Sequence, residues 1–152
     1  MRPDGANIDL YLESEIDQWI DYINSNVIPT STRVFNYVLN KTPCDQKTYS
    51  IALNEFKQTL SVFEAHFKLR NFLVGHSLTL ADAFLVSTLA HVFEVVVDKK
   101  TRDGQLSNLG RYTNLILQFD PFVSVFGHVA FCKDATQPSF ADKAPAHKQQ
   151  QQ

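Results

Sequence analysis

Apolar side chains recur at helical spacing over most of the chain. A first stripe, with steps of three or four residues, runs from Leu12 to Val27 and predicts a helix whose acidic first turns suit a helix N-terminus. Pro29 lacks a backbone N–H and disfavours helix at the residue before it, so the stripe kinks or restarts before Val34. The sequence therefore begins with one long helix or with two short ones.

A second stripe is the most regular in the chain. Its apolar residues, from Tyr49 to Phe67, follow one another in alternating steps of four and three. This pattern is typical of a helix that packs against an antiparallel neighbour in a bundle. A coiled coil with another chain is the alternative, but the register ends after about three heptads.

The most apolar stretch, residues 80–97, predicts a helix that is hydrophobic almost all round and therefore lies in the middle of the protein. Thr79 is a residue of the N-cap type, and Asp82 follows at the spacing of a capping box, with Leu78 at the staple position. Water cannot satisfy the first N–H groups of a helix that begins inside a protein. We therefore expect losing this cap to cost on the order of 1 to 2 kcal/mol or somewhat more. The spacing indicates a folding role for Asp82 and not a catalytic one.

The remaining segments predict short elements. "DKKTRDGQLSN" at 98–108 is rich in charge and turn formers and predicts a solvent-facing loop. Apolar spacing at 109–119 predicts a short helix, and Asp120 before Pro121 predicts a cap and a two-turn helix that ends at Gly127. No strand pattern and no internal repeat occur. The sequence predicts an all-α protein, a helical bundle with a buried central helix.

Composition supports one globular domain. The 152 residues are 44% hydrophobic and 20% charged, which is enough apolar material for a core. We divide the chain into an N-terminal extension (1–9), a helical domain (10–140) and a flexible tail or start of a linker (141–152), where "ADKAPAHKQQQQ" has no apolar period. No long apolar run and no secretory leader is visible, so we expect a cytoplasmic location and no membrane partner.

Charge argues against nucleic acid as a direct partner. The formal net charge is -2, and the first 25 residues carry six acids against Arg2 alone. The acidic face of the first helix is the most one-sided surface that the sequence offers. We therefore expect Glu13, Asp17 and Asp21 to face a protein partner.

Candidate chemistry is sparse. Cys44 and Cys132 lie far apart without the spacing of a metal site or a redox motif, and we expect them to be reduced thiols packed as small hydrophobes. His66 has no second ligand at metal-binding spacing. His91 and Glu94 form a titratable pair without a nucleophile in reach, which favours a hydrogen bond between helices. The sequence predicts no catalytic, cofactor-binding or metal-binding residue.

Two segments carry a resemblance to a known family. "NFLVGHSLTLADAFLVSTL" at 71–89 looks like the "FLVG" loop, Ser/Thr-x-x-Asp box and buried helix of the C-terminal, all-helical domain of the glutathione transferase fold. Over roughly residues 10 to 143 the chain is similar to the transferase-like domain of elongation factor 1 gamma subunits, also called 1B gamma. The similarity is carried by "ESEIDQWIDY" at 13–22 and "DPFVSVFGHVAFCKDATQPSF" at 120–140. Tyr112 stands where such proteins commonly have Trp.

The resemblance implies a docking role. Transferases activate glutathione from a thioredoxin-like domain, whose βαβ pattern we do not find in this sequence. The resemblance implies a non-catalytic interaction and scaffold domain of the translation elongation factor 1 complex, docking its guanine-nucleotide exchange subunit and needing no cofactor. One alternative is the helical half of an active glutathione transferase, with aromatic residues such as Trp19, Tyr22 and Phe35 as conceivable pocket lining. Another is a docking appendage of an aminoacyl-tRNA synthetase complex. A homodimer also stays open.

Overall fold

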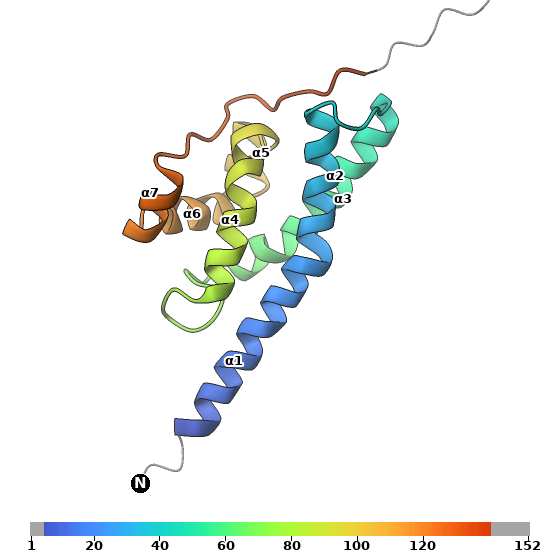
Figure 1. Ribbon diagram of the computed structural model, residues 1–152. Coiled ribbons are helices and arrows are strands. Elements are labelled where there is room, and N and C mark those ends of the chain that lie inside the picture. Colours follow the sequence, from blue (N-terminus) through green and yellow to red (C-terminus); the bar gives the residue numbers. More distant parts are fainter. Residues whose placement is uncertain (1–4, 141–152) are drawn as a thin grey trace, which may run out of the picture.

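The computed structural model describes residues 5–140, with side chains from Leu10 onward. All regular elements of these residues are helical, as the sequence predicts (Figure 1). Helix α1 begins at Gly5, so regular structure extends into the segment expected as an N-terminal extension. The tail expected at 141–152 lies outside the described residues.

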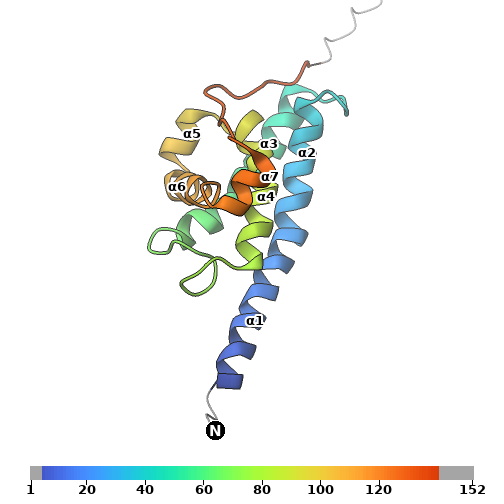
Figure 2. The same cartoon turned by 60° about the vertical axis from the view of Figure 1, so that its left-hand side comes forward.

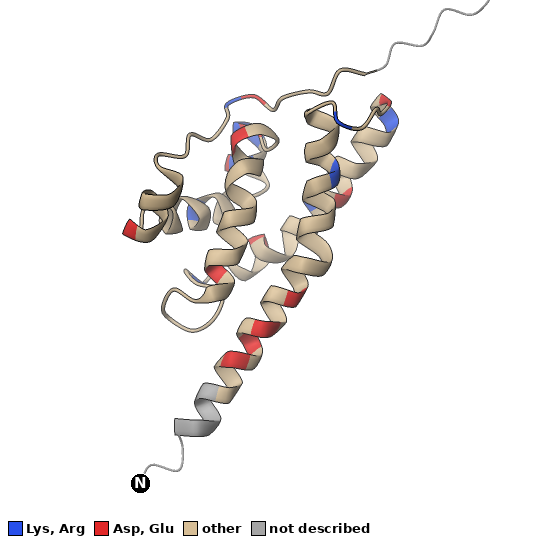
Figure 3. Cartoon of the chain, viewed as in Figure 1, with Lys and Arg blue, Asp and Glu red and all other residues tan. Residues whose placement is uncertain are grey.

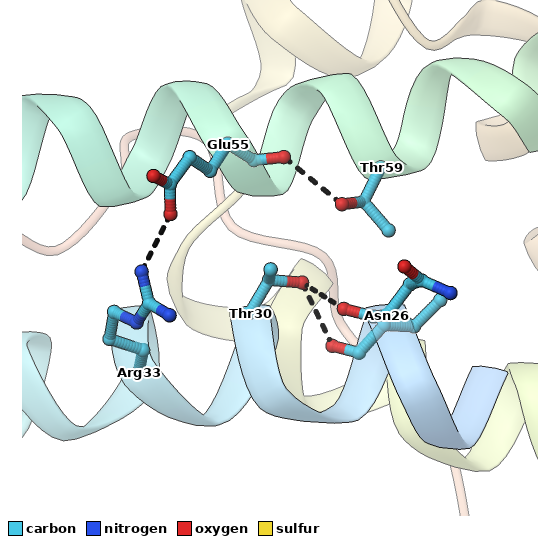
Figure 4. A network of polar contacts seen from close by, with 6 residues as sticks. Asn26, Thr30, Arg33, Glu55 and Thr59 are labelled. Carbon is cyan, nitrogen blue, oxygen red and sulfur yellow. Dashed lines mark hydrogen bonds and ion pairs between the residues drawn. The ribbon is translucent and has the colours of Figure 1, made fainter. Parts of the chain in front are cut away.

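Helix α1 (Gly5–Tyr22), the π-helical turn η1 (Ile23–Val27) and helix α2 (Ile28–Val38) form one continuous rod (Figure 1). Pro29 cannot donate a backbone hydrogen bond, and the wider turn that precedes it accommodates this loss because the Ile28 N–H bonds to the Ile23 carbonyl five residues back. The Thr30 hydroxyl donates to the carbonyl oxygens of Asn26 (2.6 Å) and Val27 (3.1 Å), shown in part in Figure 4. The proline therefore widens one turn without ending the rod.

Helix α3 (Gln46–His66) returns alongside α2 (Figure 1). The Asp45 carboxylate caps it by accepting the Thr48 N–H at 2.8 Å. Arg33 on α2 reaches Glu55 on α3 at 2.6 Å (Figure 4), but both side chains are about half exposed, so this pair contributes no more than about 1 kcal/mol. The main contribution is apolar, because Leu53 of the predicted seam is half-buried and its other members are buried: Tyr49, Phe56, Leu60, Phe63 and Phe67.

Helix α4 (Leu80–Val95) is the central helix (Figures 1 and 2). It packs against α1, α2 and α6. One side is less covered than the sequence suggests, because Leu80 is 68% exposed and Ser87 and His91 also face solvent. The buried side supplies most of the core contacts of this helix: Ala81, Asp82, Leu85, Val86, Leu89, Ala90, Val92 and Phe93.

The segment expected as a loop after α4 is helical in part, which corrects the sequence prediction. Helix α5 (Lys99–Gly104) forms because the Asp98 carboxylate accepts the Thr101 N–H at 2.9 Å, so a polar but well-capped segment makes a short helix. Helix α6 (Ser107–Ile116) packs directly on α5. Gly110 is required at this contact, because a Cβ there would lie 2.8 Å from Cγ of Arg102.

Helix α7 (Asp120–Phe126) ends at Gly127, whose φ of +66° favours glycine. Its N-cap is Phe119, so Asp120 lies inside the first turn and does not cap the helix as the sequence predicted.

An extended segment follows, residues 128–140, which we call the strap. It crosses from α7 over the end of α4 to the turn between α2 and α3 (Figures 1 and 2).

The strap is held by backbone bonds to the end of α4 and the start of α5. The Cys132 N–H donates to the Phe93 carbonyl (3.0 Å), and the Thr136 N–H donates to the Val95 carbonyl (2.8 Å). In the other direction, the Lys99 N–H donates to the Lys133 carbonyl. The first two bonds satisfy carbonyls that the C-terminus of α4 leaves without intrahelical partners, and the third satisfies an N–H at the start of α5. Side chains fix both ends of the strap: Phe131 against Phe93 and under the Arg102 guanidinium, and Phe140 against Tyr49.

Candidate interaction surface

In the capping box at the start of α4, Asp82 is completely buried and Thr79 is half-buried. Oδ2 of Asp82 accepts the backbone N–H (2.9 Å) and the hydroxyl (2.7 Å) of Thr79. Oδ1 accepts the Leu73 N–H at 2.8 Å and the Tyr112 hydroxyl at 2.7 Å. The carboxylate therefore joins the 67–79 loop, α4 and α6, and it has no free lone pair directed at a substrate.

Tyr112 is the residue that the sequence interpretation noted without a role. Its ring is fully buried and stacks on Phe67, with 3.7 Å between centroids and 15° between planes. Burial, and then the Asp82 carboxylate, raise the pKa of the Tyr112 hydroxyl far above its usual range, so Tyr112 remains a neutral donor. Tyrosine and tryptophan meet the same requirement at this position, because each has a large flat ring with one hydrogen-bond donor.

His66 is a packing residue and not a ligand. Its Nε2 lies 2.9 Å from the Leu73 carbonyl oxygen, and its ring packs against Trp19 and Phe67 at centroid distances of 4.7 and 5.3 Å. Burial lowers the pKa of the imidazole below its ordinary value, against the opposing effect of the bond to Leu73. His66 is therefore neutral at pH 7.

This neutrality predicts a loss of stability in mild acid. Between the lowered pKa of folded His66 and 6.5, the unfolded chain binds more protons, so the free energy of unfolding falls as the pH drops below about 6.5. Urea unfolding at pH 7.5, 6.5 and 5.5, followed by Trp19 fluorescence, measures the slope. His66→Gln keeps a hydrogen-bond donor but does not titrate, and it should flatten this slope. An unchanged slope in His66→Gln would show that another group is responsible.

The other titratable candidates are a surface pair on α4 and two separate thiols. His91 Nδ1 lies 3.3 Å from Glu94 on the surface of α4 itself, so the expected bond between helices is wrong; the pair lies on one helix. Cys44 is buried and Cys132 half-buried, each as a free thiol, and burial raises the pKa of both. Such thiols are poor nucleophiles at neutral pH. Within residues 5–140, no three His, Cys, Asp or Glu side chains gather as they would around a metal ion.

The acidic residues predicted to face a partner share one exposed flank of α1. Glu13, Asp17 and Asp21 are spaced four residues apart and all three are exposed. None of them forms an ion pair with another described residue. Figure 3 shows acidic bands along α1 without a basic band on that helix, whereas Lys and Arg lie on other elements.

A cavity of about 300 Å³ lies on the other flank of α1, where it faces α3. Trp19, Tyr22, Val62 and the neutral His66 form its walls, and Glu15, Gln18 and Arg70 complete the lining. Trp19 and Tyr22 are two of the aromatic residues that the transferase alternative offers as pocket lining, but the sequence does not indicate where such a pocket lies. Apolar spacing assigns Trp19 to the core stripe, whereas its ring is only partly buried. The described residues include no helix long and apolar enough to span a membrane.

Comparisons with known proteins agree with this architecture. A family model, the glutathione S-transferase C-terminal domain, matches residues 27–118. Elongation factor 1-gamma of Sus scrofa and that of Homo sapiens are each 29% identical to the chain over 136 residues, which cover 87% of the chain and 31% of each relative. Elongation factor 1-gamma-B of Xenopus laevis is 27% identical over 144 residues, 93% of the chain and 32% of that protein. The chain thus spans about a third of the length of these relatives.

A solved structure shares the fold. The GST-like domain of elongation factor 1-gamma from Saccharomyces cerevisiae superposes with a TM-score of 0.81 at 20% sequence identity, covering 89% of this chain and 61% of that one. The sequence prediction of the family and of the all-helical fold is confirmed. Since the family model covers more than half of the sequence, this chain belongs to the glutathione S-transferase C-terminal domain family.

Proposed function

We propose that this chain is a non-catalytic interaction domain of the translation elongation factor 1 complex, acting in the cytoplasm and docking the guanine-nucleotide exchange subunit. The observation that carries the proposal is the free acidic flank of α1, since Glu13, Asp17 and Asp21 are exposed and unpaired among the described residues. Its relatives named elongation factor 1-gamma support the assignment to this complex. The domain binds and positions its partner, and the partner performs the chemistry.

The buried polar groups support a role without catalysis. Asp82 is saturated by hydrogen bonds from its own fold, and His66 is engaged with the Leu73 carbonyl. Both thiols have raised pKa values because of burial. A nucleophile or a general base needs the opposite arrangement, a free lone pair directed at a substrate.

Charge reversal tests the docking surface. Changing Glu13, Asp17 and Asp21 together to Lys should slow association with a purified exchange subunit about tenfold or more at low salt, because exposed charges steer encounter. Stopped-flow or surface-plasmon measurements at two ionic strengths give the rate constants. The matched control changes Asp103, Asp120 and Asp134 to Lys, which alters the net charge equally on elements away from α1.

The identity of the partner and the role of the α1 surface are tested by separate experiments. Affinity capture from a eukaryotic lysate, with this chain as bait, should recover the exchange subunit. Recovery of aminoacyl-tRNA synthetases in its place would move the chain to the alternative assembly. Equal association rates for the two triple variants would contradict the role of the α1 flank, even if the exchange subunit is captured.

A further inference from the structure

We propose that the cavity between α1 and α3 receives a basic side chain, by preference arginine, from a protein partner. This inference rests on the proposed function for the identity of that partner, but the cavity chemistry can be tested without it. Its aromatic walls and its acidic edge are the two features that carry the proposal.

The walls present aromatic rings that the core holds in place. Trp19 packs against Phe63 at 5.4 Å between centroids, and Tyr22 packs against the same ring at 5.6 Å. Trp19 and Tyr22 lie nearly perpendicular to each other, at 6.2 Å and 83°. Both rings are only partly buried, so part of each remains accessible from the cavity. Preorganised Trp and Tyr rings attract cations through their quadrupoles, and a planar guanidinium can also stack on them.

The charges around the cavity favour a cation on the α1 side. Glu15 contributes a carboxylate and Gln18 an amide oxygen, both suited to accept from a guanidinium. Glu15 forms no ion pair with another described residue. His66, on the opposite wall, adds no positive charge because it is neutral at pH 7.

Arg70 is the one described basic side chain in the lining, and it sets the orientation of the ligand. It also borders a neighbouring cavity of about 410 Å³, together with Leu12 and Phe72. An incoming guanidinium must therefore lie toward Glu15 and away from Arg70. Removing the charge of Arg70 should strengthen binding of a cation, whereas it would weaken binding of an anion, so this residue distinguishes the two kinds of ligand.

Trp19 is the only tryptophan in the chain, so its fluorescence reports on the cavity directly. The 152-residue chain is titrated with N-acetyl-arginine-N-methylamide at low ionic strength. Its neutral isostere, N-acetyl-citrulline-N-methylamide, serves as the control probe. We expect saturable quenching by the arginine probe, with a Kd in the millimolar range, and at least roughly threefold weaker binding of the citrulline probe.

Matched variants localise the effect. Glu15→Gln should weaken binding of the arginine probe about threefold to tenfold. Glu13→Gln, the same change on the opposite flank of α1, should leave that affinity nearly unaltered. Arg70→Met should strengthen binding of the arginine probe about twofold or more. Unchanged melting temperatures show that the variants fold.

Three results would overturn the proposal: quenching that does not saturate, equal binding of the arginine and citrulline probes, or equal effects of Glu15→Gln and Glu13→Gln. Weaker arginine binding in Arg70→Met would show that Arg70 does not repel the bound guanidinium, and this fourth result would overturn the proposal too. The proposed function fails on different evidence. If the exchange subunit is not captured while the arginine probe binds as expected, the cavity proposal stands and its natural partner is a different protein.

Discussion

The double variant Thr79→Ala, Asp82→Ala should unfold at a temperature roughly 10 °C or more below the parent chain, because it removes the centre of a buried polar network. Asp82 accepts four hydrogen bonds at zero solvent exposure, and alanine leaves the N–H of Leu73 and the hydroxyl of Tyr112 without a partner. Unsatisfied buried donors, the lost helix cap and the small cavity together cost about 3 to 5 kcal/mol.

Single variants separate these contributions. Thr79→Ala alone keeps the Asp82 bonds to Leu73 and Tyr112, so it should cost only about 1 to 2 kcal/mol. Tyr112→Phe removes a donor but keeps the stacked ring, and its cost should also be a minor part of the total. Calorimetry and urea unfolding measure these changes, and affinity for a partner per folded molecule should stay constant. If the double variant melted like the parent, the network would not be a stability determinant.

Removing residues 128–152 should cost about 2 to 4 kcal/mol, because it deletes the strap from the end of α4. The carbonyls of Phe93 and Val95 lose their donors, and the guanidinium of Arg102 loses both the Phe131 ring and the Cys132 carbonyl. The apolar surface that the strap covers, which includes the buried ring of Phe93, becomes exposed to water.

The matched control for this deletion is removal of residues 141–152 alone, which leaves every described contact of the strap intact. Differential scanning calorimetry should place the shorter deletion within about 2 °C of the parent and the longer one roughly 5 to 15 °C lower. Hydrogen exchange should show faster opening at the C-terminal turn of α4 and in α5 when the strap is absent. Equal melting of the two truncated chains would show that the strap only rests on the surface.

The parts of this fold that the sequence predicts are those encoded by neighbouring residues. The seam from Tyr49 to Phe67 and the spacing of Thr79 and Asp82 repeat within a few turns, so periodicity and capping rules find them. The helix at 80–95 stands out because apolar residues lie on all its sides. The sequence predicts a loop after Asp98 because the segment is polar and charged, although Asp98 caps a short helix there that also packs on α6.

The parts that the sequence does not predict depend on distant residues. The bond from Tyr112 to Asp82 joins positions on two helices, and the strap joins Cys132 to Phe93 and Phe140 to Tyr49. The cavity beside Trp19 also depends on how α1 and α3 diverge. Spacing along the chain carries no signal for such contacts. The acidic flank of α1 was accessible to sequence reasoning because its three carboxylates lie on one helix.

The widened turn η1 has a consequence for how this rod tolerates changes in length. A π turn holds one residue more than the α-helical turn that it replaces, and one residue corresponds to about 100° of rotation about the helix axis. Ile23 and Val27, at the two ends of this turn, are buried in the core, as are Val34 and Val38 on α2. Deleting one residue between Ile23 and Val27 would restore ordinary winding and swing the whole N-terminal arm about its own axis. Insertions and deletions at this point are therefore a route by which related chains could re-aim the carboxylates of α1 without substituting any of them.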